Sequence, residues 1–229
     1  GSVFGIRFDL SAGNLGSETR PVIISGNSID ATSTGNEVFG IFILRTGAGA
    51  SDIYSVITGN KMLNLQSNNA AYGIRLYSFN GSIGSAASPV IISGNLLDVT
   101  SNANIAYGTF LHSSGNIFAN IKHNYMDVTA ATNAYGGNLE SGSGIIGDVT
   151  SLATSFYKNA GTIIGTNNRY MLILDGTVNG GNYVNWKENS FTPVGGAWSG
   201  NYNIGDSLPA PGGPGPVQTN FGAGDTITP

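Results

Sequence analysis

Several residues able to bind or transform a ligand recur at two positions of a repeated apolar segment. The segment consists of an aromatic residue, a glycine and an alternating apolar run, as in Tyr72–Leu76 and Tyr107–Leu111. Two residues after the glycine stand Arg75, Phe110 and Asn138, and four residues after it or its equivalent stand Tyr77, His112, Glu140 and Asp175. Aromatic rings pack against the apolar faces of sugars, and Arg, Asn and His side chains hydrogen-bond to hydroxyl groups. A glycan-binding surface is therefore predicted at Arg75, Tyr77, Phe110, His112 and Asn138.

A pair of carboxyl groups on neighbouring copies of this segment offers a second kind of chemistry. Glycoside hydrolases use two carboxyl groups about 5–5.5 Å apart to retain stereochemistry and a wider pair to invert it. Crowding Glu140 against Asp175 would raise the pKa of one of them, as a general acid requires. The alternative is that this position is only the solvated face, where polar residues are common, and Leu44 at this position in an earlier copy interrupts the column of reactive residues. Binding needs no tuned pKa, so we expect binding without turnover.

Two alternating motif families supply the elements that position these residues. One contains an asparagine turn, as in Ile24–Asp30 and Ile92–Asp98, and the other is the aromatic–glycine segment described above. The recurring asparagines are Asn27, Asn60, Asn95, Asn124, Asn159 and Asn189, at intervals of 29 to 35 residues. His123, which precedes one of them, is interpreted as a turn residue. Short alternating apolar runs separated by Gly, Asn and Ser predict strands and turns throughout the repeats.

Stacking of the repeats follows from their size. A unit of about 30 residues cannot bury its apolar face alone, whereas stacked units form a solenoid with a continuous core. The recurring asparagines then lie above one another and form a hydrogen-bonded ladder between strands about 4.8 Å apart. The aromatic–glycine segments stack in the same way. Tyr77, His112, Glu140 and Asp175 are therefore expected in one column on the outer face.

The apolar–x–apolar–x–x–Asn–x–apolar pattern of these copies resembles the right-handed parallel β-helix of the pectate-lyase-like superfamily. The resemblance covers about 190 of the 229 residues. It implies an all-β fold, a β-solenoid of about six coils, but it does not imply one activity. The superfamily includes polysaccharide lyases, glycoside hydrolases, epimerases, phage tailspikes and adhesins. Its lyases combine clustered Asp ligands for Ca²⁺ with a catalytic Arg or Lys, whereas here Phe42 separates Arg7 from Arg75 and no acidic cluster accompanies them.

The composition argues against several classes of protein. Only 10% of the residues are charged, and 9 Lys and Arg stand against 13 Asp and Glu, so no nucleic acid partner is expected. The absence of cysteine excludes disulfides, cysteine metal sites and cysteine nucleophiles. Apolar runs of four or five residues predict no membrane insertion. We expect no metal and no cofactor, and an extracellular or virion-surface location.

Three functions follow from this reading of the sequence. The first is a surface fibre, most similar to a phage tailspike fragment, that binds host or environmental glycans without its own chemistry. The second is a polysaccharide-cleaving enzyme that uses Glu140 and Asp175. The third is a self-assembling filament or adhesin module. A homo-oligomer, either a trimer or a filament, is expected. Residues 1–192 are expected to form the repeats, and residues 193–229 a terminal coil or cap with an irregular Pro/Gly-rich tail that is a candidate assembly segment.

Overall fold

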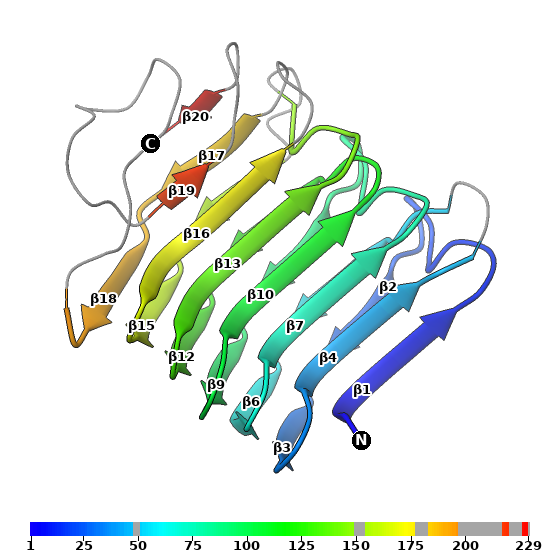
Figure 1. The fold of residues 1–229 in the computed structure, drawn as a ribbon. Coiled ribbons are helices and arrows are strands. Elements are labelled where there is room, and N and C mark those ends of the chain that lie inside the picture. Colours follow the sequence, from blue (N-terminus) through cyan, green and yellow to red (C-terminus); the bar gives the residue numbers. More distant parts are fainter. Residues whose placement is uncertain (48–50, 149–153, 177–182, 197–216, 220–225, 229) are drawn as a thin grey trace.

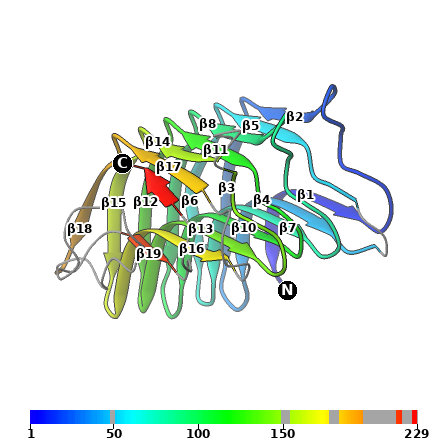
Figure 2. The ribbon, with the colours of Figure 1, turned by 90° about the horizontal axis from the view of Figure 1, so that it is seen from above.

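The fold consists of strands and turns arranged in successive coils. The computed structural model describes residues 1–47, 51–148, 154–176, 183–196, 217–219 and 226–228, and no helix occurs among them (Figure 1). Each strand belongs to one of three parallel sheets. The coils stack along one axis, from β1 at one end to β19 and β20 at the other, as Figures 1 and 2 show.

The three sheets take one strand in turn from each coil. The first sheet contains β1 (Val3–Leu10), β4 (Val38–Arg45), β7 (Ala71–Ser78), β10 (Ala106–Ser113), β13 (Asn133–Ser141), β16 (Asn168–Gly176) and β19 (Val217–Thr219). The second contains β2 (Val22–Ser25), β5 (Ser55–Thr58), β8 (Val90–Ser93), β11 (Ala119–Lys122), β14 (Ser155–Tyr157), β17 (Tyr183–Lys187) and β20 (Thr226–Thr228). The third contains β3 (Ser28–Ser33), β6 (Lys61–Ser67), β9 (Leu96–Ser101), β12 (Tyr125–Ala130), β15 (Ala160–Gly165) and β18 (Ser190–Val194). The prediction of an all-β parallel solenoid is confirmed, with about five turns.

Alternation along the first sheet separates the core from the outer face. Ile74 and Leu76 on β7 are fully buried and belong to one continuous core, whereas Arg75 and Tyr77 lie on the other face. The glycine of each segment stands directly before the first inward-facing residue of this alternating run, as Gly73 stands before Ile74. A Cβ on Gly108, for example, would lie 2.6 Å from the carbonyl oxygen of Gly136 on the next coil. A side chain here would push neighbouring coils apart, which explains why glycine recurs at this position.

The recurring asparagines form a ladder at the turn between the second and third sheets. Each side-chain Nδ2 donates to the Oδ1 of the next asparagine, with N···O distances of 2.9–3.2 Å from Asn27 to Asn189. The residue before each asparagine has a positive φ. These residues are Gly26, Gly59, Gly94, His123, Lys158 and Glu188, with φ between 50° and 67°. His123 therefore occupies a turn position, which agrees with its interpretation from the sequence.

The end of the chain adds strands to two of the sheets. β19 pairs with β16 and β20 pairs with β17. β18 extends from Ser190 to Val194 beside β15. Residues 197–216, which include the Pro/Gly-rich segment, lie outside the described residues.

Candidate functional site

The column predicted from the sequence is present on the outer face of the first sheet. Tyr77 on β7 is the register partner of His112 on β10, His112 that of Glu140 on β13, and Glu140 that of Asp175 on β16. All four side chains are partly exposed. Alignment of the segments on their glycine, or on Met171 in β16, therefore predicts the register between these strands.

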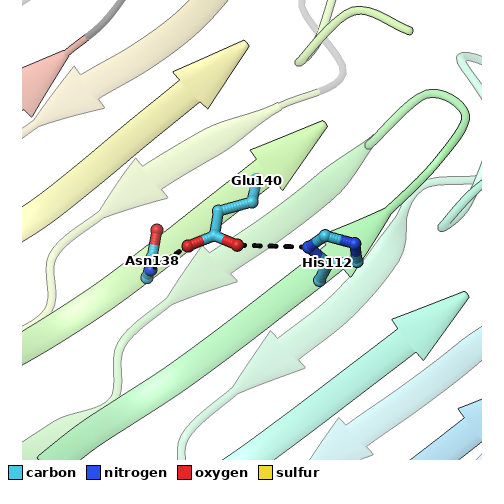
Figure 3. A network of polar contacts seen from close by, with 3 residues as sticks. All are labelled: His112, Asn138 and Glu140. Atoms are coloured by element: carbon cyan, nitrogen blue, oxygen red, sulfur yellow. Dashed lines mark hydrogen bonds and ion pairs between the residues drawn. The ribbon is translucent and has the colours of Figure 1, made fainter. Parts of the chain in front are cut away.

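Three of the predicted site residues form a polar network (Figure 3). One carboxylate oxygen of Glu140, Oε2, lies 3.1 Å from Nδ1 of His112, and the other, Oε1, accepts a hydrogen bond of 2.8 Å from Nδ2 of Asn138. A carboxylate can only accept, so Nδ1 of His112 carries a proton and the tautomer of a neutral imidazole is fixed. Among the described residues, no partner hydrogen-bonds to Nε2 of His112.

Glu140 is held as a carboxylate by this network. Its burial alone would raise its pKa, but the hydrogen bonds from His112 and Asn138, with the positive charges of His112 and Arg75, lower that pKa below its ordinary value. The sequence predicted that crowding against Asp175 would raise a pKa, and for Glu140 this is wrong. The carboxylate reaches toward β10 and binds His112, and no hydrogen bond to Asp175 is found among the described residues.

Stacked rings flank the network. The ring of Tyr77 lies parallel to the imidazole of His112, with centroids 4.4 Å apart. Phe79, just past the end of β7, is 56% exposed, and its ring centroid lies 6.0 Å from that of Tyr77. Sequence reasoning missed Phe79 because it lies beyond the repeated segment. Its place two residues after Tyr77, on the same side of the chain, is the one signal that pointed to it.

An aromatic ladder lies beneath and beside this column on the same face. Successive rings stand one per coil with centroids 4.9–5.8 Å apart. The ladder consists of Phe4, Phe39, Tyr72, Tyr107, Tyr135 and Tyr170. Burial raises the pKa of Tyr135 to about 12, so its hydroxyl stays protonated. The rings stabilise the stack, since each such pair contributes about 0.5–1.5 kcal/mol beyond its burial.

The ladder buries part of the predicted glycan-binding set. Phe110 is 7% exposed and Asn138 is 3% exposed, although both were expected to face solvent. The alternation correctly indicates the outer face, but neighbouring side chains fill the space around these two. Arg75 is half-buried, and its guanidinium carbon lies 4.7–5.6 Å from five ring centroids. These rings belong to Phe39, Phe42, Tyr72, Tyr77 and Phe110. Phe110 and Asn138 therefore support the exposed column from within, and Arg75 is partly covered by the rings.

The exposed part of the site is the set Tyr77, Phe79, His112, Glu140 and Asp175, which we call the outer strip. It combines ring surface with two carboxyl groups and one imidazole. Within the described ranges no group of three or more His, Asp or Glu side chains is arranged to hold a metal ion. The same part of the chain contains no apolar helix of membrane-spanning length. Comparison with family models, with curated proteins and with solved structures found no match.

Proposed function

We propose that the protein binds a glycan through the outer strip, without chemistry of its own. The observation that carries this proposal is the fixed ring pair of Tyr77 and His112. Its imidazole is held on one face by Tyr77 and at Nδ1 by Glu140, which leaves Nε2 for a ligand. Ring surface for the CH face of a sugar and a hydrogen-bonding atom for its hydroxyl groups are thereby combined before any ligand arrives. Such preorganisation reduces the entropy lost on binding.

Exposed Phe79 extends the ring surface of the strip at the end of β7. Phe79 is one of four exposed large hydrophobic residues in the part of the chain that the structure describes, and its ring lies next to that of Tyr77. A sugar has both apolar CH faces and polar edges, so a surface that alternates rings and polar groups suits it better than a purely apolar patch does. We infer an extracellular or virion-surface setting for such a protein, in keeping with its low content of charged residues.

The test is a glycan array with the 229-residue chain, followed by titration of the best binder. Phe79→Ala and His112→Ala should each weaken binding by about tenfold, which corresponds to about 1.4 kcal/mol for one lost contact. Tyr125→Ala is the matched control, because Tyr125 is 44% exposed on the outer face of the third sheet. Equal affinities in all three variants, or no glycan bound by the wild type, would refute the proposal.

Cleavage of a polysaccharide is the second candidate function, and one observation favours it. Glu140 and Asp175 are register partners on adjacent strands, and the lowered pKa of Glu140 suits a base or a nucleophile rather than an acid. In that case Glu140→Gln should bind the glycan and release no reducing ends, while the wild type releases them. If the wild type releases no reducing ends from any glycan that it binds, cleavage is refuted and binding remains the proposed function.

A further inference from the structure

We propose that the outer strip selects uncharged saccharides and rejects those that carry carboxylates, such as polyuronates. This inference rests on the proposed function, because it names the class of glycan bound at the same surface. Three features carry it: the two carboxyl groups of the strip, the hydrogen-bonding state of His112, and the position of the single guanidinium nearby.

The exposed charges of the strip are acidic. Glu140 is about one-third exposed and is kept ionised by its bonds to His112 and Asn138. Asp175 is its register partner on the next strand and is partly exposed. Arg7 and Asp9, farther along the same face, form an ion pair with each other at 2.5 Å and add no net charge. A carboxylate on a bound sugar would therefore meet like charge at the end of the strip formed by β13 and β16.

The imidazole of His112 also discriminates by hydrogen bonding. Nδ1 donates to Glu140, so in the neutral ring Nε2 has a lone pair and no proton, whereas in the positively charged ring that lowers the pKa of Glu140 it carries a proton. A hydroxyl group can hydrogen-bond to Nε2 in either state, as donor or as acceptor, whereas a carboxylate can only accept and finds no donor at Nε2 of the neutral ring. Glu140 is thus a positioning residue that fixes which groups of a ligand His112 can bind.

The guanidinium of Arg75 does not compensate for both of these carboxylates. It lies among five aromatic rings, and its Nε is buried without a hydrogen-bond partner. Recognition of a carboxylate by arginine uses two parallel N–H groups of an accessible fork. The buried Nε is not available as one of these two groups, which leaves the terminal nitrogens of the guanidinium. The cation lies among the rings and lowers the pKa of Glu140, and its single charge offsets one of the two carboxylates of the strip but not both.

The experiment compares matched pairs of polysaccharides that differ only in their carboxyl groups. We would titrate the 229-residue chain with polygalacturonate and its carboxyl-reduced form, and with an oxidised glucan and its parent glucan. The uncharged member of each bound pair should bind at least about tenfold more tightly at low salt, which corresponds to about 1.4 kcal/mol. The difference should shrink as sodium chloride rises from about 50 to about 500 mM, because salt screens exposed charges.

Variants then assign the selectivity to the strip. Asp175→Asn, and the double variant that adds Glu140→Gln, should reduce the ratio between the uncharged and the acidic member of a pair to below about threefold. Asp98→Asn is the matched control, since it removes one acidic group from the outer face of the third sheet. Tighter or equal binding of the acidic members by the wild type, or an unchanged ratio in both strip variants, would overturn the inference and leave glycan binding standing. Binding of no saccharide at all would instead overturn the proposed function, and this inference with it.

Discussion

Replacing one asparagine in the middle of the ladder should lower the free energy of unfolding more than replacing one at its end. Asn95 is 2% exposed and takes part in four hydrogen bonds through its side chain. Its Oδ1 accepts from the backbone N and the Nδ2 of Asn60, both at 3.0 Å. Its Nδ2 donates to the carbonyl oxygen of Ile57 at 3.0 Å and to Oδ1 of Asn124 at 2.9 Å. Leucine has a similar shape and makes none of these bonds.

The magnitude follows from the groups that Asn95→Leu leaves behind. The backbone N–H of Asn60 loses its acceptor in a buried position, which costs about 1–3 kcal/mol. The Nδ2 of Asn60 keeps the carbonyl oxygen of Ile24 at 2.9 Å, so it is not left unpaired. Each further hydrogen bond that is lost and not replaced costs about 0.5–1.5 kcal/mol. We therefore expect Asn95→Leu to lower the free energy of unfolding by about 3 kcal/mol in total.

Asn27→Leu is the matched control at the start of the ladder. Asn27 is only partly buried, and it donates to Asn60 and to the carbonyl oxygen of Ser25 but accepts from no ladder asparagine among the described residues. The same substitution there should cost about 1 kcal/mol, because no buried N–H loses its acceptor. Urea unfolding followed by far-UV circular dichroism gives both losses from the midpoints and slopes. Equal losses, or an unchanged midpoint for Asn95→Leu, would refute the reasoning.

Two further predictions concern single residues of the turn and the strip. His123→Gly should stabilise the protein by about 0.5 kcal/mol, because relief of the strain at a φ of 56° outweighs the greater freedom of glycine in the unfolded chain. Lys122→Gly in β11 should instead destabilise the protein, and thermal unfolding measures both changes. Glu140 has a lowered pKa in the folded state, so its stabilising contribution is present above the ordinary value of 4.5 and is lost as pH falls through the folded pKa. The difference in unfolding free energy between wild type and Glu140→Gln should therefore shrink between about pH 6 and pH 3, and a difference that grows would contradict the network.

The fold was predictable because its two motifs mark positions that stacking makes obligatory. An asparagine marks each turn, and a glycine marks every aromatic segment but the last, where Met171 replaces it, so both motifs are visible in the sequence as a repeat. A third column was not recognised: Leu15, Ile53, Ile83, Ile117 and Ile146 stack through single bridges between the first and second sheets. These residues lie in connections of varied sequence, where a single apolar residue carries no period.

The sequence predicted which residues of the site lie in one column, but it did not predict which side chains contact one another. Alternation indicates the face on which Asn138 and Phe110 lie, but their burial depends on the volumes of the rings around them. The choice of His112 over Asp175 as partner of Glu140 depends on the side-chain conformation that the Asn138 amide stabilises. Interactions of this kind are made between side chains of different coils, so they cannot be predicted from the spacing of residues along one strand.

The spacing of the coils decides what size of ligand the outer strip can hold. Its register partners from Tyr77 to Asp175 extend over three strand spacings, about 14 Å in all. One sugar ring covers only part of that length, so a ligand that touches both the Tyr77–His112 ring pair and Asp175 must run along the stack. The groups that contact it then come from four different coils. Their relative positions depend on the same close stacking that the asparagine ladder and the glycine column maintain, so recognition on this face is a property of the stack and not of any single coil.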